Sequence, residues 1–141
     1  MTPSKDTENI RDLIVRLSRR SRRDLMARLR AARTGLRPLA YNILTLIADR
    51  PLTSREAAEE MGINPPPFVS AVDALENKGY LKRSSDPRDR RRLPLLITEK
   101  GRLLLNKIPK IAPSDSLARS LARLGAKDIK VLCALLDKLA Q

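Results

Sequence analysis

Residues 62–101 read GINPPPFVSAVDALENKGYLKRSSDPRDRRRLPLLITEKG, and this stretch decides the fold. Asn64 and three prolines open a helical pattern that Gly79 closes. Apolar runs at 80–84 and 93–97 then predict two short strands joined by a very basic turn. This is the order of a recognition helix followed by a β-wing, and a hairpin tip so rich in cations indicates a polyanionic partner.

The helix that follows Gly62 has an unusual start and a clear buried face. Each proline disfavours the helical region for the residue before it, so we expect Pro65 and Pro66 to stay partly extended and the regular helix to begin near Pro67. Asn64 is the expected N-cap. The apolar spacing predicts a buried face formed by Phe68, Ala71, Val72 and Leu75. The outer face would carry Ser70, Asp73, Ala74 and Asn77, with Val69 toward its rim.

The two strand candidates predict a two-stranded ribbon. Pro94 cannot donate to a ladder, so its strand is expected at an edge, or with its amide side turned away from its partner. The tip concentrates positive charge, with four arginines within five residues: Arg88, Arg90, Arg91 and Arg92. We expect this wing to be the energetic anchor of the complex with a polyanion.

The residues before Gly62 predict two more helices. Pro38 suits a first helical turn, and the apolar stripe after it predicts a helix over about 37–49, followed by a short connector. Thr53 and Glu56 form a capping box that starts the next helix, which ends at Gly62. The short reversal into the following helix is the connection that a helix-turn-helix requires.

Leucine-rich helical patterns flank this central unit. An amphipathic helix with many arginines on its polar face is expected over 6–32, and further helices follow Thr98. We therefore predict a mainly α fold with a small β-wing. Its winged helix-turn-helix over 35–101 would lie between terminal helices, 1–34 and 102–141, that form a dimerisation region. A two-fold dimer would present two recognition helices to successive major grooves of a palindrome-like operator.

Composition supports nucleic acid as the partner. The chain has 141 residues and a formal net charge of +13, and its 20 arginines outnumber its nine lysines, a bias that suits bidentate phosphate and base contacts. An anionic membrane surface would also attract such a chain. No stretch is long enough for a membrane span, and the expected location is the cytoplasm of a bacterium or archaeon.

Catalysis is not expected. The chain has no histidine and a single cysteine, Cys133, which removes the commonest general base, a histidine-containing metal site and any intramolecular disulfide. No cofactor or metal is therefore predicted. Three glutamates at 56, 59 and 60 are interpreted as solvated helix surface. Cys133 lies in an apolar run and is interpreted as a small core residue rather than a redox switch.

The chain resembles the MarR family of winged-helix transcriptional regulators over nearly its full length. TSREAAEEMGINPPPFVSAVDALENKGYLKR resembles the third and fourth helices of the family, and SDPRDRRRLPLLITEKG resembles its wing, with the Asp-Pro, Asp-Arg-Arg and Thr-Glu-Lys-Gly elements in place. The resemblance implies a homodimer that occupies promoter DNA, usually as a repressor. It also implies that a small molecule or an oxidant often releases the DNA.

The resemblance also implies roles for individual residues. Arg90 and Arg91 would enter the minor groove from the wing tip, and Asp89 would orient an arginine through a charge-assisted hydrogen bond. The start of the third helix would lie near phosphates and the fourth helix would occupy the major groove. The expected DNA-contacting set is Thr53, Ser54, Arg55, Pro65, Pro66, Pro67, Val69, Ser70, Asp73, Arg88, Asp89, Arg90 and Arg91.

This chain departs from the family pattern on the reading face of the fourth helix. Where similar proteins commonly carry a threonine, another hydroxyl residue and an arginine, it has Pro67, Val69 and Ser70. The bidentate contact from arginine to guanine is therefore missing from this helix, and we expect affinity to come largely from phosphates and the wing. Tyr41 is a candidate for an effector cavity at the dimer junction, although a packed core role is favoured.

A second class of function stays open at this point. The same scaffold and basic surface would suit a winged-helix module that holds an acidic protein, with only weak and nonspecific binding to DNA. Steep salt dependence on a short palindromic duplex favours the regulator, whereas tight binding to an acidic protein favours the interaction module.

Overall fold

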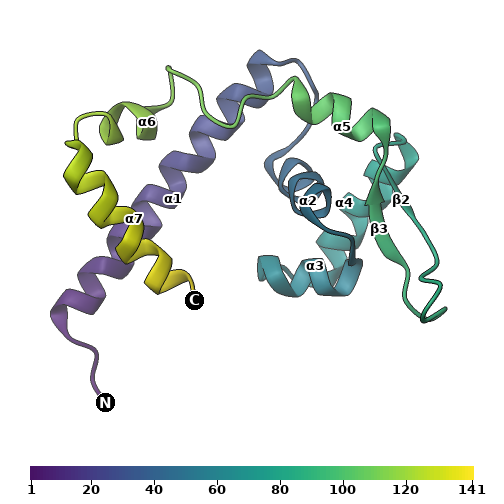
Figure 1. The fold of residues 1–141 in the computed structure, drawn as a ribbon, viewed down its shortest axis with the longest axis horizontal. Helices are drawn as coiled ribbons and strands as arrows, with labels where there is room; N and C mark the ends of the chain where they lie inside the picture. Colours follow the sequence, from purple (N-terminus) through teal and green to yellow (C-terminus); the bar gives the residue numbers. More distant parts are fainter. The chain divides into compact units, whose positions relative to one another are not determined.

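A computed structural model describes all 141 residues, which fold as two compact units. The central unit is Arg28–Pro109, and the terminal unit joins Met1–Ala27 to Lys110–Gln141. Figure 1 shows the helices, which are α1 (Lys5–Ala31), α2 (Pro38–Asp49), α3 (Ser54–Met61), α4 (Pro65–Asn77), α5 (Glu99–Asn106), α6 (Ser116–Leu121) and α7 (Ala126–Ala140). The strands are β1 (Leu52–Thr53), β2 (Leu81–Arg83) and β3 (Pro94–Ile97).

The predicted boundaries differ from this division. The end of α1 and the whole of α5 group with the central unit, whereas the prediction placed residues before 35 and after 101 with the terminal helices. All the predicted helices and both strands are present, and the fold class is confirmed as mainly α with a small antiparallel sheet. The dimerisation role of the terminal helices stays a prediction.

The sheet has three strands rather than the predicted two, in the order β1-β3-β2. The residues expected to form a connector after α2 contribute β1, whose Leu52 pairs with Leu95 and whose Thr53 pairs with Pro94. The strand that holds Pro94 is therefore the central one, and the prediction of an edge was wrong. Pro94 is tolerated because it is the first residue of its strand, and its carbonyl still accepts a hydrogen bond from the Ser84 amide at 3.1 Å.

The start of α4 also corrects the prediction, because the helix begins at Pro65 and not near Pro67. Asn64 occupies the N-cap position but makes no side-chain capping bond. The physical reason is that an N-cap side chain accepts from the amides of the second and third helical residues, and here both are prolines without an amide hydrogen. The prolines fill positions whose donors would have had no partner within the helix.

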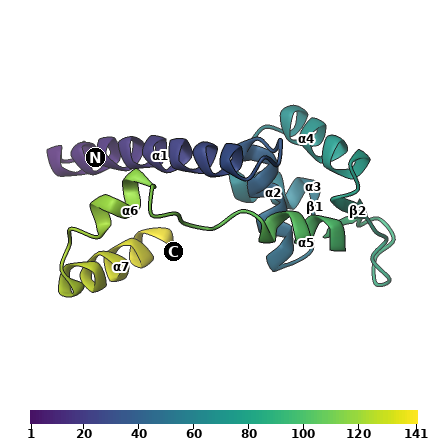
Figure 2. The same cartoon turned by 90° about the horizontal axis from the view of Figure 1, so that it is seen from above.

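A single apolar core holds the central unit together. Phe68, Val72 and Leu75 on α4 are almost fully buried, as predicted, against Ile43, Leu44 and Ile47 of α2 and Leu81 and Leu95 of the sheet. Gly62 takes a left-handed conformation with φ of 64° and ends α3, and the Ile63 amide bonds to the Ala58 carbonyl at 3.0 Å. The reversal places α3 and α4 as a helix-turn-helix, and the β2–β3 hairpin projects beside them (Figures 1 and 2).

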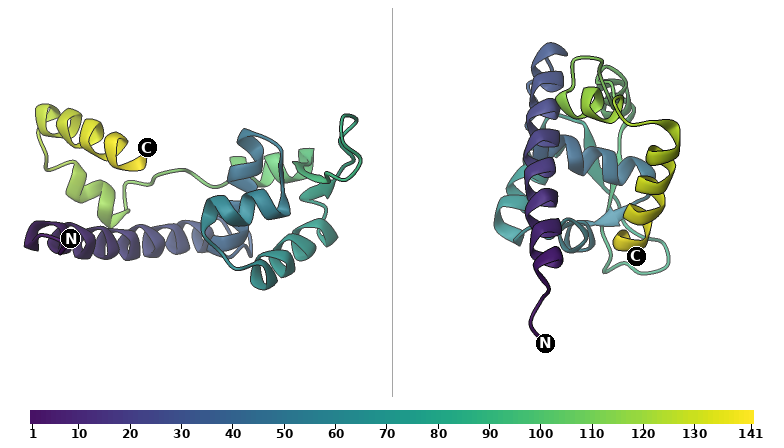
Figure 3. Two further views of the ribbon diagram at one scale, coloured as in Figure 1. Left: turned by 90° about the horizontal axis from the view of Figure 1, so that it is seen from below. Right: turned by 90° about the vertical axis from the view of Figure 1, so that its left-hand side faces the viewer.

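The terminal unit has little core of its own. Arg20 on α1 donates to the Ser116 carbonyl at 2.8 Å and to the Ser120 hydroxyl at 2.7 Å, and the Asp24 carboxylate accepts from the Ser116 and Leu117 amides at 2.9 and 3.0 Å. These bonds fix α6 against α1 (Figure 3). Cys133 is exposed on α7, so its interpretation as a core residue was wrong for the single chain. No helix combines the length and apolar character needed to cross a membrane.

Candidate nucleic-acid interface

The start of α3 presents a capped helix terminus. The Thr53 hydroxyl accepts a hydrogen bond from the Glu56 amide at 3.1 Å, as the predicted capping box requires. The Ser54 hydroxyl is buried and has no hydrogen-bond partner, while the side chain of Arg55 is 89% exposed and pairs with Glu59 at 3.3 Å. Arg55 is therefore the side chain at this helix start whose charge faces solvent, and a phosphate oxygen could approach it from there.

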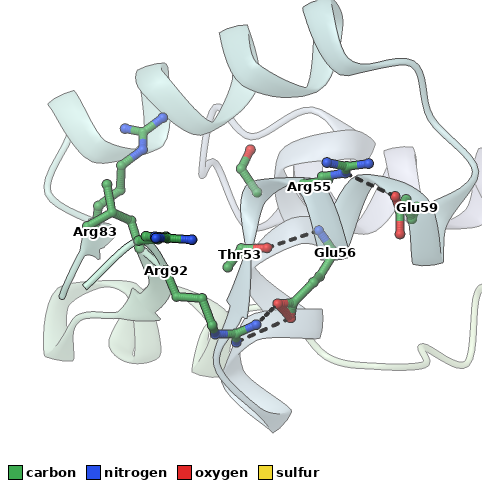
Figure 4. A pocket seen from close by; sticks show the side chains of 9 residues that line it. Thr53, Arg55, Glu56, Glu59, Arg83 and Arg92 are labelled. Atoms are coloured by element: carbon green, nitrogen blue, oxygen red, sulfur yellow. Dashed lines mark hydrogen bonds and ion pairs between the residues drawn. The ribbon is translucent and has the colours of Figure 1, made fainter. Parts of the chain in front are cut away.

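The helix start and the wing line a common cleft of about 620 Å³. Figure 4 shows Arg55, Arg83 and Arg92 around it, and Arg91 also lines it. Three of these four arginines are paired with carboxylates. Arg91 makes no ion pair, so its charge is the one in the cleft that no carboxylate offsets.

The outer face of α4 is exposed and sparse in polar groups. Pro65, Pro66, Pro67, Val69, Ser70 and Asp73 are all exposed, in agreement with the predicted outward face. Val69 also lines a shallow apolar groove of about 600 Å³ between α3 and α4, beside Ala58, Ile63 and Phe68. The face offers apolar contacts and one hydroxyl to a partner, since the Asp73 carboxylate is already paired with Arg83 at 2.8 Å.

The wing is an ordered turn, which we define as residues 84–93 between β2 and β3. The Asp86 carboxylate accepts from the Arg88 amide at 2.9 Å, and the Asp89 carboxylate accepts from the Arg91 amide at 3.0 Å. Asp89 therefore holds the backbone of the turn in this structure, and its role in orienting an arginine side chain on DNA stays a prediction. The side chains of Arg88, Arg90 and Arg91 are exposed and make no ion pair, so the wing tip carries three unpaired positive charges.

Arg92 differs from the other wing arginines. Its guanidinium donates to both carboxylate oxygens of Glu56, from Nη1 and, at 3.4 Å, from Nη2 (Figure 4). Its Nε lies 3.4 Å from the Asp86 carboxylate. The Arg92 guanidinium lowers the pKa of Glu56 below its usual value, and Glu56 in turn raises the pKa of Arg92. The interpretation of Glu56 as solvated helix surface was therefore wrong, because its carboxylate is paired with Arg92. This pair connects the wing to α3.

Arg83 was not singled out from the sequence. Its guanidinium donates to Asp73 at 2.8 Å and to Glu76 at 2.6 Å, and its own amide donates to Glu76 at 3.3 Å. The hydrogen bond that the guanidinium donates to Asp73 raises the pKa of Arg83. The one signal in the sequence was that Asp73 and Glu76 lie three residues apart, so that both fall on the same face of α4. Nothing in the sequence indicates that β2 brings an arginine to these two carboxylates.

The remaining predicted site residue is Tyr41. It is half-buried on α2 in the central unit and lines neither of the two clefts described above. Its backbone carbonyl accepts a hydrogen bond from the Thr45 hydroxyl at 2.9 Å. The chain also has no group of three or more histidine, cysteine or acidic side chains placed to hold a metal ion.

Comparison with known proteins agrees with this geometry. The sequence model of the MarR family matches residues 34–92, and a putative transcriptional regulatory protein for the hcr operon of Thauera aromatica is 34% identical over 106 residues, or 74% of this chain. The central part of the chain is therefore similar to the MarR family. The chain spans 63% of the length of the Thauera protein. The family match covers α2, β1, α3, α4, β2 and the wing as far as Arg92.

Solved structures of MarR-type proteins share this fold over all or nearly all of the chain. The transcriptional repressor CouR bound to a 23-mer DNA duplex has a TM-score of 0.75 at 28% identity, with 100% of this chain and 99% of that one covered. CouR from Rhodococcus jostii RHA1 bound to p-coumaroyl-CoA has a TM-score of 0.73 at 28% identity, covering 93% and 91%. MarR from E. coli has a TM-score of 0.78 at 19% identity, covering 100% and 99%, which shows the fold alone.

Proposed function

We propose that this protein is a MarR-type, homodimeric transcriptional regulator that binds double-stranded DNA and represses its target promoter. The observation that carries the proposal is the pairing, within one unit, of an exposed helix-turn-helix face with a wing tip that bears three unpaired arginines. The similarity to CouR, a repressor described with a DNA duplex, supports the same interpretation.

Phosphate contacts and the wing supply most of the proposed affinity. Arg88, Arg90 and Arg91 are free to neutralise phosphates or enter a narrow minor groove, since no carboxylate of the chain competes for them. Arg55 pairs with Glu59 on the exposed surface and presents its guanidinium at the start of α3, where helix amides also favour anions. The net charge of +13 would steer the protein toward DNA at long range.

Base readout by α4 is proposed to be modest. Val69 is 40% exposed and suits contact with a thymine methyl group, and Ser70 can bond to either kind of base edge. The three exposed prolines at 65–67 have no amide donor, so the start of α4 offers shape and apolar contact more than hydrogen bonds. Discrimination between operators would therefore depend on groove shape as well as on direct contacts.

A second copy of the chain is the proposed partner of the terminal unit. Apolar residues stay exposed on α1, at Ile10, Leu13, Ile14, Val15 and Leu17, and on α7, at Val131, Leu135, Leu136 and Leu139. Leu25 is the one buried apolar side chain of this unit. Faces this apolar are stable in water when another surface covers them, and a two-fold dimer buries the same faces of both copies.

We further propose that a small molecule releases the DNA. The CouR structure with p-coumaroyl-CoA makes aromatic acyl-CoA thioesters a rational first panel of effectors. Catalysis is not part of the proposal, because the named relatives are regulators. A cytoplasmic location follows from the proposed partner, which is promoter DNA.

The test is selection of bound sequences from a random duplex pool by the purified protein. The proposal expects an enriched sequence with two-fold symmetry and half-sites about one helical turn apart. The alternative, an interaction module for an acidic protein, expects no enrichment and weak binding that does not depend on sequence. An unenriched pool together with steeply salt-dependent binding to every duplex would leave only nonspecific DNA affinity and would reject the regulator.

A further inference from the structure

The contact between Arg92 and Glu56 joins two elements that are far apart in the sequence. Glu56 lies in the first turn of α3, and Arg92 lies 36 residues later, where the wing returns to β3. Both carboxylate oxygens of Glu56 accept from the two terminal nitrogens of the guanidinium, which is the bidentate geometry that fixes a direction as well as a distance. The Arg92 side chain is 40% exposed and the Glu56 side chain is 34% exposed, so the pair is partly shielded from solvent.

The same guanidinium is fixed from its other side by the wing. Its Nε lies 3.4 Å from the Asp86 carboxylate, which also accepts from the Arg88 amide at 2.9 Å. The Asp86 amide bonds to the Arg92 carbonyl at 3.2 Å, and the Arg92 amide bonds to the Asp89 carbonyl at 3.0 Å. Arg92 therefore belongs to the closed turn that carries Arg88, Arg90 and Arg91, and its contact with Glu56 fixes that turn to α3.

The other ion pairs of α3 do not connect this helix to the wing. Arg55 and Glu59 lie four residues apart on the same helix, with side chains 89% and 70% exposed. Glu60 pairs with Arg50, just before β1, at 2.5 Å, with side chains 54% and 43% exposed. Neither pair touches the wing, so Glu56 is the acidic residue of α3 that links the helix-turn-helix to the wing.

We propose that Glu56 and Arg92 are positioning residues, which set the direction of the wing arginines relative to α3 and α4 and so determine how well the protein distinguishes its operator from other DNA. This inference rests on the proposed function, since it concerns the specificity of the proposed DNA complex. A wing held at a fixed angle engages the minor groove only where that groove lies in register with the major-groove contacts of α4. A wing that swings freely engages any phosphate backbone.

Electrostatics alone predicts the opposite result for removing Glu56. Loss of a negative charge near DNA reduces repulsion and tightens binding to every duplex. Loss of positioning instead weakens the operator complex selectively. A fall in the ratio of operator to scrambled affinity therefore separates a positioning role from a simple charge effect, which leaves this ratio unchanged.

The experiment compares E56Q with E60Q, which removes the same charge from the same helix outside the cleft and the wing. Affinities for the selected operator and for a scrambled duplex are measured by fluorescence anisotropy at several salt concentrations. The expected result is that E60Q keeps the wild-type ratio of operator to scrambled affinity, while E56Q lowers that ratio about tenfold. An E56Q ratio equal to that of wild type, or a change equal to that of E60Q, would overturn the proposal.

A second measurement needs no DNA and separates failure of this inference from failure of the proposed function. Amide hydrogen exchange of residues 84–93 reports the order of the wing, and thermal unfolding confirms that each variant is folded. E56Q and R92Q are each expected to speed exchange at the Arg88 and Arg91 amides at least fivefold, and the double variant is expected to add little to either. Unchanged exchange in E56Q would reject the positioning role. Faster exchange in a protein that prefers no duplex would reject the proposed function instead.

Discussion

The carboxylate of Glu76 holds both the side chain and the backbone of Arg83. Its Oε1 accepts from the guanidinium at 2.6 Å, and its Oε2 accepts from the Arg83 amide at 3.3 Å. The guanidinium also donates to Asp73, one turn earlier on α4. The strand that leads into the wing is therefore fixed to the outer face of the helix that would read the major groove.

Replacement of Arg83 by glutamine is expected to lower the free energy of unfolding by about 1–2 kcal/mol, because it leaves two carboxylates close together without their cation. Chemical denaturation gives the value. Lys82 is exposed on the same strand, so K82Q serves as the matched control, with an expected change within about 0.5 kcal/mol. Equal effects of R83Q and K82Q would show that the paired arginine contributes nothing to stability.

Gly101 on α5 is expected to tolerate no side chain. A Cβ at this position would lie 2.2 Å from the Tyr80 carbonyl oxygen and 2.8 Å from Cγ1 of Ile97. G101A should therefore lose about 2 kcal/mol or more, because backbone atoms must move. The control is G125A, where a Cβ meets nothing within 4 Å and the expected change is below about 1 kcal/mol. A G101A protein with wild-type denaturation would show that α5 does not pack this closely.

Asp24 is expected to stabilise the start of α6. Its carboxylate accepts from the Ser116 and Leu117 amides, and such capping contacts contribute about 1 kcal/mol. D24N keeps the size of the side chain and should speed amide exchange at Ser116 and Leu117 without affecting the central unit. D12N is the control, because Asp12 is exposed and pairs only with its neighbour Arg11. The account of α6 fails if exchange at both amides is unchanged in D24N.

Acid is expected to destabilise the protein partly through Asp24 and Glu56. Burial acts to raise the pKa of Asp24, but the amides of Leu117 and Ser116 outweigh it, and contact with Arg92 lowers the pKa of Glu56. A carboxyl whose pKa is lower in the folded protein stabilises it above the unfolded pKa, and this contribution disappears as the pH falls through the folded value. Unfolding measured from pH 6 to pH 3 should therefore show a shallower loss of stability below about pH 4.5 in D24N/E56Q than in wild type.

The sequence predicted the elements well because local patterns decide them. The caps at Thr53 and Thr98, the break at Gly62 and the apolar spacing on α4 all act over three or four residues, and each is present in the structure. The local pattern gave the wrong start for α4, because helix propensity disfavours a run of prolines within a helix. Burial of Phe68, Val72 and Leu75 outweighed that preference, since the prolines removed only donors that had no partner.

The candidate site was less predictable, because pairing between distant residues decides it. The exposure of Arg90 and Arg91 follows from a basic turn, and this was predicted. Nothing local distinguishes Arg92 from these neighbours, yet its guanidinium is bound to Glu56. The third strand was missed for the same reason, since Leu52 and Thr53 form β1 only because β3 lies beside them.

The central claim is that the wing arginines anchor the protein to DNA while the α4 face adds limited readout. The most direct measurement is fluorescence anisotropy on the selected operator with wild type, S70A and R90A/R91A at several salt concentrations. The account predicts that R90A/R91A binds on the order of 100-fold more weakly with a salt dependence reduced by about two counterions, and that S70A loses less than about fivefold. A larger loss in S70A than in R90A/R91A would contradict it.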